Sequence, residues 1–562
     1  MKKDKKNLYF GQAGINNAPY LSKLIDMFDS YAKFYVRPDK AFFKFQEHFS
    51  YEAYLEKTKL NKESMSPDQV FKYLAPFVQN MPNWLNPGTM INVIPPPNLL
   101  SVASSAYICM LNPNMAQDTF AGLVSAAEFE VAKYISELVG WNWKKSYGLF
   151  TFGGKATNLY GTKLALQRAY CAGLKNGYGG KEFFIITGEL GHPCHKEVCA
   201  WLGIGSDACV SIECAKNSQE IDLKKARAVI EQHIAQGKIF LGFNLNGGST
   251  NEFAIDPVKK VYRLSKQIQS KYQLSYRPFI HVDSVLGWVY LFFNEYDFNK
   301  NELKIDAQTL LKIQSLALKT AEFKYADSLG IDFHKTGFCP YTSSLFLVQN
   351  KNDYFNLNAS KKSLQEPIPF GSYATFESSL ELTRSATGQM AALTCLKSLG
   401  IKGFQQIIAD LLSAVLFFRK TLRRARNLWV ISAKSDGFAT FLLIKPPKFQ
   451  TLCVQDFKNL TPEQIQQIKT YNQKFALFVE QQAHLGTITF TFTASRSYVL
   501  PESKITVGAL KLYPMSVYFD KDVALNVAAQ MQSMIKFFEK NYDKLTLREN
   551  QYVPADLVYR QS

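Results

Sequence analysis

A histidine–lysine pair near the middle of the chain has the residue types that covalent cofactor chemistry requires. Residues 326–335 read ADSLGIDFHK, so an apolar run with two aspartates ends in His334 and Lys335. A lysine amine can form a Schiff base with a carbonyl compound, whereas a lone histidine–lysine pair is more often a solvated surface feature. We predict Lys335 as a point of covalent attachment because partners for an attached group occur upstream.

Residues 151–159 have the pattern of a loop that could hold a phosphate. Gly153 and Gly154 permit a tight turn and a close backbone approach to a ligand, and a helical pattern over Tyr160–Tyr170 follows them. The start of a helix offers unpaired N–H groups and a positive dipole end to an anion. A tight turn without a ligand is the alternative interpretation.

Two further stretches could contact a flat ring. His192 follows the apolar run 183–187 and could lay its imidazole against a bound aromatic ring, with His195 as the competing histidine. A purely structural role stays open for a lone histidine. The loop 246–250, with the sequence NGGST, offers hydroxyl groups after another apolar run, although an ordinary turn would have the same sequence.

Asp283 is a more specific candidate because it ends the apolar run 279–283, within the sequence HVDS. A carboxylate there is costly unless it meets a cation, and a protonated pyridine nitrogen would supply one. An ion pair with arginine or lysine is the alternative. Phosphate loop, stacking ring, hydroxyl loop, pyridinium partner and Lys335 thus follow one another in the order that a single cofactor would require.

The elements that must position these residues form an alternating pattern. Short β-branched and aromatic runs alternate with helical stretches between about residues 145 and 350. This alternation predicts an α/β fold in which a mostly parallel sheet is flanked by helices, and such sheets bind ligands at the carboxyl ends of their strands. The predicted strands are Phe183–Thr187, Cys209–Ile212, Ile239–Leu245, Phe279–Asp283 and Ser344–Val348.

The flanking regions predict helices and a smaller second unit. We expect an N-terminal helical segment over residues 1–90, a large domain over 91–385 and a small α+β domain over 386–562. The predicted helices are Tyr20–Val36, Pro67–Gln79, Gly122–Gly140 and Ala386–Arg426. Two further strand-like pieces, Gly437–Ile444 and Thr487–Phe492, fall in the small domain.

Composition excludes several classes of protein. The 562 residues are 47% hydrophobic and 20% charged, which is globular and neither disordered nor collagen-like. The net charge of +18 is spread along the chain, so it favours solubility or a polyanionic neighbourhood and predicts no specific nucleic-acid site. Nine cysteines without a C-x-x-C pair argue against a disulfide framework and a zinc ribbon, which predicts a reducing, cytoplasmic location and no metal.

Membrane targeting is not expected from the sequence. The basic start Met1–Lys6 is not followed by an apolar segment long enough for a signal peptide. The longest apolar stretches, such as Leu99–Leu111, are too short and too interrupted by serine to cross a bilayer. We therefore predict no membrane span.

Between about residues 90 and 400 the chain resembles the group II pyridoxal 5′-phosphate (PLP)-dependent decarboxylases, which include glutamate and aromatic amino-acid decarboxylases. Gly248–Thr250 resembles the family's Gly-Thr-Thr, His281–Ser284 its His-Val-Asp-Ala, and Asp332–Lys335 its Asn/Asp-x-His-Lys. The other matching segments are 187–205, which resembles the family's histidine segment, Asp256–Pro257, and Glu381–Ser385, which resembles the segment that closes the large domain.

The resemblance implies a fold-type I PLP-dependent transferase fold with a seven-stranded sheet, and PLP as the cofactor. It implies that Lys335 carries the Schiff base, that His192 stacks on the cofactor and that Asp283 binds the pyridine nitrogen. The other implied cofactor contacts are Gly154, Lys155, Thr250, Asp332 and His334. The implied reaction is decarboxylation of an L-amino acid to its amine and CO₂. Another PLP-dependent lyase, an oxidative deaminase and a non-catalytic relative are the alternatives.

The resemblance further implies a homodimer, in which the aromatic-rich first 90 residues could wrap a partner. Two departures leave the amino-acid substrate open: Lys155 stands where relatives often carry a small or hydroxyl residue, and the bulky segment Ser284–Trp288 could reshape the cavity. For the tyrosine of the family's mobile catalytic loop, Tyr354 and Tyr373 are both candidates. We expect burial and a cationic neighbourhood to lower the pKa of Lys335.

Overall fold

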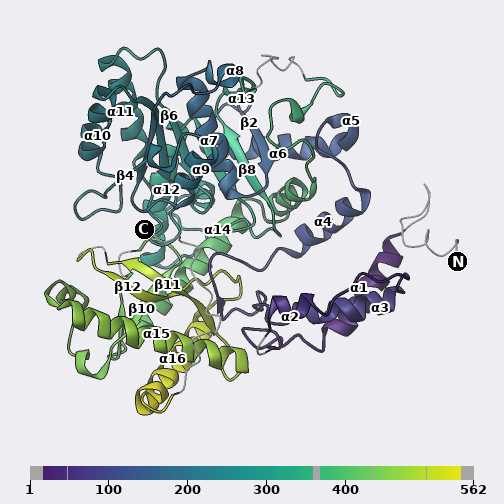
Figure 1. Ribbon diagram of the computed structural model, residues 1–562, viewed down its shortest axis with the longest axis vertical. Helices are drawn as coiled ribbons and strands as arrows, with labels where there is room; N and C mark the ends of the chain where they lie inside the picture. The colour runs from purple at the N-terminus through teal and green to yellow at the C-terminus, as the bar shows by residue number, and fades with distance from the viewer. Residues whose placement is uncertain (1–16, 47–48, 358–367, 433–434, 501–502, 546–562) are drawn as a thin grey trace.

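Two β-sheets organise the chain, and helices surround both (Figure 1). The computed structural model describes residues 17–46, 49–357, 368–432, 435–500 and 503–545. The basic start Met1–Lys6 lies outside the described residues, as do both ends of the predicted three-part division. That division stays a prediction.

The larger sheet has seven strands, which confirms the predicted fold class. Its strands in spatial order are β2 (Tyr147–Thr151), β8 (Ser344–Val348), β7 (Ser328–Asp332), β6 (Phe279–Asp283), β5 (Ile239–Asn246), β3 (Phe183–Gly188) and β4 (Cys209–Ile212). Only β8 runs antiparallel to its neighbours, and every other pair of adjacent strands is parallel. The five strands predicted for this region are all present.

β2 and β7 were not predicted as strands because glycine interrupts their apolar pattern. In β7 the interruption is Gly330, where an added Cβ would lie 2.2 Å from Thr157 Oγ1 on the adjacent helix. That helix is α7 (Gly154–Ala169), and it packs against β5, β6, β7 and β8. Close packing of α7 on the sheet therefore requires glycine at this position. The glycine interrupts the apolar pattern that would have indicated a strand.

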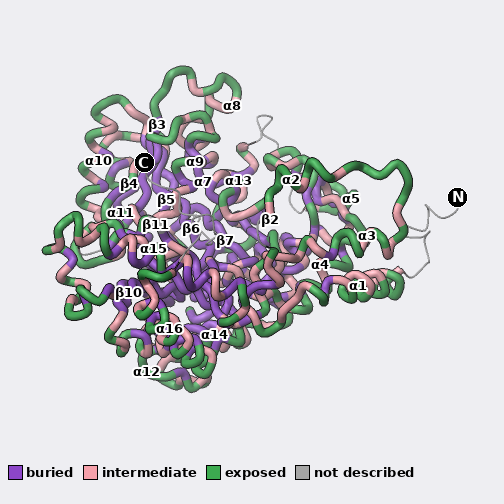
Figure 2. The backbone as a smooth tube through the Cα atoms, turned by 60° about the horizontal axis from the view of Figure 1, so that its bottom comes forward, coloured by how far each residue is buried: buried purple, intermediate pink, exposed green. Residues whose placement is uncertain are grey.

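Helices flank the large sheet, and its strands are almost entirely buried (Figure 2). The main flanking helices are α6 (Ser125–Val139), α7, α9 (Cys194–Trp201), α10 (Leu223–Ala235), α11 (Val258–Lys271) and α12 (Ala307–Thr320). The predicted helix Gly122–Gly140 is present as a short 3₁₀ turn followed by α6. Buried strands of this kind place their polar residues at the strand ends, where the predicted site lies.

α14 (Thr387–Arg423) confirms the predicted long helical region. Among the described residues it is the one helix long and apolar enough to meet the length and hydropathy criteria for crossing a membrane, which corrects the expectation that no such segment exists. However, Gly400 breaks its helical geometry with a φ of 59°, and half of its most apolar window is buried inside the protein. These features are typical of a core helix.

The smaller sheet has five strands in the order β1-β11-β12-β10-β9. Their bounds are β1 (Thr89–Met90), β9 (Leu428–Val430), β10 (Thr440–Ile444), β11 (Thr491–Val499) and β12 (Thr506–Leu512). α15 (Pro462–Leu485) packs against this sheet, and α16 (Lys521–Asn541) packs against α14 and α15. β11 begins later than the predicted strand Thr487–Phe492. β1 comes from the segment predicted to be helical, because a two-residue strand leaves no periodic signal.

The N-terminal helices project from the rest of the molecule (Figures 1 and 2). They are α1 (Ala18–Ala32), α2 (Tyr51–Leu55) and α3 (Pro67–Leu74). Both predicted helices in this region are present but end earlier than predicted, and a 3₁₀ turn, Ala75–Val78, follows α3. Few of these residues are buried, so this part adds little to the core.

Candidate active site

The residues predicted to do chemistry converge on one cavity at the carboxyl edge of the large sheet. Asp283 ends β6, while His192, Thr250 and Lys335 follow β3, β5 and β7. The residues that line the cavity are Gly154, Lys155, Asn158, His192, Cys194, Asn246, Gly248, Ser249, Thr250, Asp283, Val285, Asp332, His334 and Lys335. Every site residue predicted from the sequence is among them.

Lys335 lies in the turn directly after β7, where a carboxylate holds its ammonium group. Its Nζ is 2.7 Å from Oδ2 of Asp332, and His334 Nε2 is 3.6 Å from the same oxygen. Burial pulls the pKa of Lys335 down, but attraction to Asp332 outweighs burial and raises that pKa above its ordinary value. The expectation of a lowered pKa is therefore wrong for this state, because Asp332 is the nearest charge to the amine.

Asp283 is a buried carboxylate that stays ionised. Burial alone would raise its pKa, but the nearby His195 and a hydrogen bond from Asn158 outweigh burial and bring the pKa below its ordinary value. Asn158 Nδ2 donates to Asp283 Oδ2 at 2.9 Å. A negative charge thus faces the cavity from the end of β6.

A hydrogen-bond chain behind Asp283 fixes the orientation of this carboxylate. Asn158 Oδ1 lies 2.9 Å from His281 Nε2, and His281 Nδ1 lies 2.8 Å from Ser328 Oγ. Because the Asn158 amide donates to Asp283, its oxygen must accept, which assigns the proton of His281 to Nε2 and makes Ser328 the donor to Nδ1. Burial lowers the pKa of His281 to about 3, so this imidazole is neutral.

Sequence reasoning did not select Asn158, His195 or Ser328 as functional residues. Asn158 lay inside the predicted phosphate loop, and its place one helical turn after Gly154 was the only available signal. Ser328 begins β7, directly opposite His281 of β6 in the parallel register. Pairing between strands distant in sequence created this contact, so no local pattern could reveal it.

The structure separates the roles of the two candidate histidines. His192 lines the cavity, and its Nδ1 accepts a hydrogen bond from the backbone N–H of Cys194 at 3.2 Å. Burial lowers the pKa of His192 to about 4, which leaves a neutral ring available for stacking. His195 does not line the cavity: it is buried beside Asp283, with Nε2 3.7 Å from Oδ2.

The start of α7 forms one end of the cavity and has the features of an anion-binding site. Gly153 has a φ of 140° at the N-cap, and no side chain caps the first turn. A Cβ on Gly154 would lie 2.7 Å from Asp332 Oδ2, so glycine is required for this close approach. Lys155 pairs with Glu197 of α9 and lines the same end. Helix N–H groups and an ammonium group together suit a phosphate.

Two expectations about neighbouring residues need correction. Neither Tyr354 nor Tyr373 lines the cavity in the described part of the chain: both are buried, and the Tyr373 hydroxyl lies 2.8 Å from that of Tyr147. The bulk of Trp288 does not reshape the cavity either, because its ring is buried against Phe333 at 4.7 Å. Apolar packing outside the cavity accounts for these side chains.

Tyr341 is an aromatic residue beside the site that was not predicted. Its ring lies at a tilt against the His334 ring, with 4.2 Å between centroids, and the residue is 54% exposed. Burial raises the pKa of Tyr341 to about 12, so the hydroxyl stays protonated, and it donates to the Val93 carbonyl oxygen at 3.4 Å. Tyr341 therefore holds an aromatic ring next to the lysine turn.

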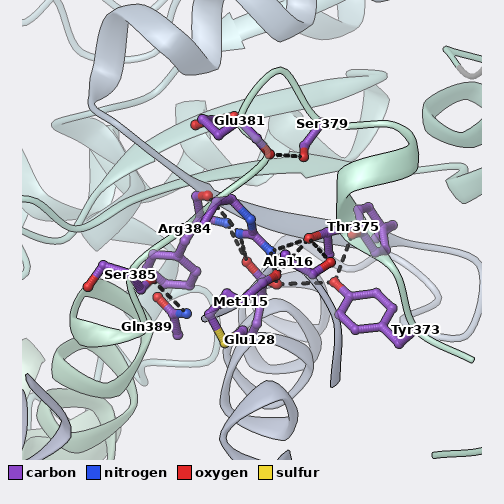
Figure 3. Close-up of polar contacts among 12 residues, drawn as sticks. Met115, Ala116, Glu128, Tyr373, Thr375, Ser379, Glu381, Arg384, Ser385 and Gln389 are labelled. Carbon is purple, nitrogen blue, oxygen red and sulfur yellow. Dashed lines mark hydrogen bonds and ion pairs between the residues drawn. The ribbon is translucent and has the colours of Figure 1, made fainter. Parts of the chain in front are cut away.

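Arg384, in the segment expected to close the large domain, forms a buried clamp instead of a cavity wall (Figure 3). Its guanidinium binds both carboxylate oxygens of Glu128 on α6, at 2.8 and 3.1 Å. It also donates to the Phe150 carbonyl oxygen at 3.0 Å and to Thr375 Oγ1 at 3.0 Å. The clamp fixes the chain between Tyr373 and Arg384 onto α6, next to β2.

Comparisons with known proteins relate the chain to amino-acid decarboxylases. An L-aspartate decarboxylase of Metarhizium robertsii is 22% identical over 299 residues, which cover 53% of this chain and 54% of the relative. An L-2,4-diaminobutyrate decarboxylase of Acinetobacter baumannii is 23% identical over 285 residues, which cover 48% and 50%. The chain is thus similar to these amino-acid decarboxylases over about half of its length. It matches only about half the length of these curated relatives.

Solved structures are similar in fold to nearly the whole chain. The apo form of mouse CSAD superposes with a TM-score of 0.74 at 15% sequence identity, covering 92% of this chain and 99% of that protein. No protein-family model matches the sequence. The chain therefore shares its fold with this structure at low sequence identity.

The Arg384 clamp predicts a large stability effect. Arg384→Leu leaves the Glu128 carboxylate buried without its cation, and breaking a buried pair in this way costs about 3–5 kcal/mol in the free energy of unfolding. Urea denaturation measures this loss. Lys133→Ala is the control because it breaks a largely exposed pair with Glu137 and should cost under about 1 kcal/mol. Equal effects from the two variants would contradict the clamp.

Proposed function

We propose that this protein is a PLP-dependent decarboxylase that converts an L-amino acid into its amine and CO₂, with PLP attached to Lys335. One observation carries the proposal: an amine, an ionised carboxylate, a neutral imidazole and an uncapped helix start face the same cavity. PLP carries an aldehyde, a pyridine nitrogen, an aromatic ring and a phosphate, and each has a matching partner among these groups. The residues present therefore fit the cofactor.

The chain's own residues divide the work of holding this cofactor. Lys335 would bind its aldehyde carbon, and the α7 start with Lys155 and Thr250 would hold its phosphate end. Asp283 would keep a proton on the pyridine nitrogen, because its carboxylate stays ionised and is oriented by Asn158. When bound, PLP supplies the electron sink for the electrons released as the α-carboxylate leaves.

His192 and Asp332 would have separate roles in the cavity that both line. The neutral His192 ring would pack on the flat face of the cofactor and exclude water from that face. Asp332 holds the Lys335 ammonium through Oδ2 and accepts a second hydrogen bond from Ser344 Oγ at 2.5 Å on its other oxygen. This arrangement keeps the Lys335 amine protonated. The amine becomes a nucleophile once it loses that proton.

The alternatives are other reactions on the same fold and a non-catalytic relative. Fold and cofactor do not by themselves decide which bond breaks, so another lyase or an oxidative deaminase uses the same residue types. The intact combination of Asp283, Lys335 and His192 on one cavity disfavours a non-catalytic protein. No observation on the described residues favours an alternative over decarboxylation.

A homodimer is part of the proposal, and an exposed apolar face supports it. α4 (Leu99–Leu111) leaves Leu99, Leu100, Tyr107 and Leu111 between 55% and 80% exposed. Adjoining segments add the exposed side chains of Phe120, Leu123, Leu380 and Leu382. Exposed apolar side chains gathered on a few neighbouring segments favour a protein interface. A second copy is the partner that the proposal assigns to this face.

The location in a reducing, cytoplasmic compartment is also proposed. All nine cysteines lie within the described residues and carry free thiols, and the two exposed near the large sheet, Cys109 and Cys171, have no disulfide partner. Free thiols persist where glutathione and thioredoxin keep them reduced.

The function is tested by mapping the attachment and identifying the products. The purified protein should be yellow with PLP, and borohydride reduction followed by peptide mapping should place the adduct on Lys335. An amino-acid panel should then yield one substrate that gives CO₂ and amine in equal amounts, and Lys335→Ala should abolish this activity. An adduct on Lys155, or ammonia and aldehyde as the products, would overturn the respective part of the proposal.

The pH dependence of cofactor attachment tests the role of Asp332. Only the neutral amine attacks a carbonyl, and Asp332 raises the pKa of Lys335, so the attachment rate should increase as pH rises towards that pKa. Asp332→Asn removes the attraction while keeping the size, which lowers the pKa and should move the rise to lower pH. Stopped-flow absorbance of apo protein mixed with PLP measures the profile.

Asp207→Asn is the matched control, because Asp207 is exposed and remote from the cavity. Its attachment profile should coincide with that of the parent protein. An Asp332→Asn protein that folds with the parent's melting temperature but shows an unshifted profile would contradict the role assigned to Asp332.

The dimer face is tested by placing charges on α4. Leu99→Asp combined with Leu111→Asp puts two carboxylates into the proposed contact, which costs association free energy because buried charges lose their hydration. The variant should sediment as a monomer at concentrations where the parent is a dimer. Leu311→Asp on α12, at a position 67% exposed, should leave the dimer intact. A monomeric, fully active parent would refute the dimer.

A further inference from the structure

A second cavity lies on the small domain, away from the candidate active site. It is a groove of about 910 Å³ between the turn after β10, the first half of α15 and the end of α16. The same region forms the lower part of the view in Figure 1. None of its lining residues belongs to the cavity that holds Lys335. The proposed decarboxylation therefore leaves this groove without a role.

The groove is acidic although the whole protein is strongly basic. Glu463, Glu539 and Asp543 line it, against a single lining lysine, Lys448. Within the described part of the chain, none of these three carboxylates forms an ion pair, while the net charge of the full sequence is +18. The uncompensated negative charge favours a cationic ligand.

Two buried polar atoms at the groove lack hydrogen-bond partners among the described residues: the Tyr471 hydroxyl oxygen and Glu539 Oε1. Tyr471 is only 5% exposed, and its ring is held by Phe538 and Tyr542, each with 5.1 Å between centroids. Buried polar groups in folded proteins nearly always have partners. The Tyr471 hydroxyl and Glu539 Oε1 line the groove, so a group bound in the groove can supply the partners for both.

The unpaired atoms define the chemistry of that ligand. A carboxylate only accepts hydrogen bonds and a tyrosine hydroxyl can accept one, so the complementary group is a donor. An ammonium group supplies three donors and the positive charge that the groove requires. The Lys474 ammonium already packs 4.7 Å from the centre of the Tyr542 ring, an interaction that shows how this aromatic wall accommodates a cation.

We propose that the groove binds a primary amine with an apolar or aromatic body and without a carboxylate. Its ammonium would sit between Glu539 and Tyr471, and its body would lie along Phe449 and Tyr542. An α-carboxylate would be repelled by the acidic lining, so the groove distinguishes an amine from the parent amino acid. The proposed reaction makes that same conversion, and the choice of an amine product as the physiological ligand rests on the proposed function.

Calorimetric titration of the full-length chain tests the binding. The borohydride-reduced protein serves as the background, because a reduced linkage on Lys335 can no longer exchange with an added amine, and 2-phenylethylamine is the probe. L-Phenylalanine, which differs from the probe by a carboxylate, should bind at least about tenfold more weakly, the loss expected for one unfavourable charge contact. Glu539→Gln should weaken binding of the amine about 10- to 100-fold, because it removes a charge-assisted hydrogen bond.

Asp543→Asn provides a second variant at an exposed position, which safeguards the test if the change at Glu539 disturbs folding. Asp207→Asn, outside the groove, should bind the probe as the background does. Equal binding of amine and amino acid, or unchanged binding in both groove variants, would overturn the proposal. Binding that appears only after removal of residues 546–562 would assign the groove to the chain's own end and would overturn it as well.

These outcomes stay separate from the test of the proposed function. A protein that binds the amine in the groove but never decarboxylates an amino acid would support the groove proposal and contradict the proposed function. An active decarboxylase whose groove variants bind the probe like the background would support the proposed function and contradict the groove proposal.

Discussion

The ionised Asp283 carboxylate, buried at the end of a central strand, is the constraint on which the arrangement of the site depends. A buried charge is tolerated only when hydrogen bonds and nearby cations replace its hydration. Here the hydrogen bond comes from Asn158, whose orientation is fixed in turn by His281 and Ser328. These contacts join α7, β6 and β7. The charge state of Asp283 therefore depends on the register of the two strands and on the position of α7 against them.

A second carboxylate, on the neighbouring strand, pairs with the lysine of the site. Asp332 ends β7 as Asp283 ends β6, and one lysine lies close to both. The ammonium group sits on Asp332, which leaves the Asp283 charge available to a cation in the cavity. Gly154 permits this geometry, since any larger residue would collide with Asp332. The phosphate end and the lysine end of the cavity are therefore coupled through a single close contact.

The sequence predicted the strands and the residues at their ends because both are local signals. Apolar runs marked five strands of the large sheet, and Asp283 ended one of them. Lys335 was selected by its residue type and its upstream partners, because β7 was not predicted as a strand. Contacts between distant segments left no such signal. His195 lies beside Asp283 only because α9 packs there. Whether the pKa of Lys335 is raised or lowered depends on the position of the Asp332 carboxylate. Tyr354 and Tyr373 were credible candidates for the same reason, since their burial is a tertiary property.

In the proposed enzyme, selectivity for the substrate side chain would depend little on the segment after Asp283. Among the described residues of that segment only Val285 lines the cavity, because Trp288 packs in the core beside Phe333. At the start of α7, the half-exposed Lys155 pairs with Glu197, a pair that a charged ligand can compete with at low cost. The half-exposed Tyr341 lies at a tilt against His334, which lines the cavity. A change at these exposed positions would alter what the cavity admits, whereas a change at Asn158 or His281 would disturb the hydrogen bonds that hold the Asp283 carboxylate.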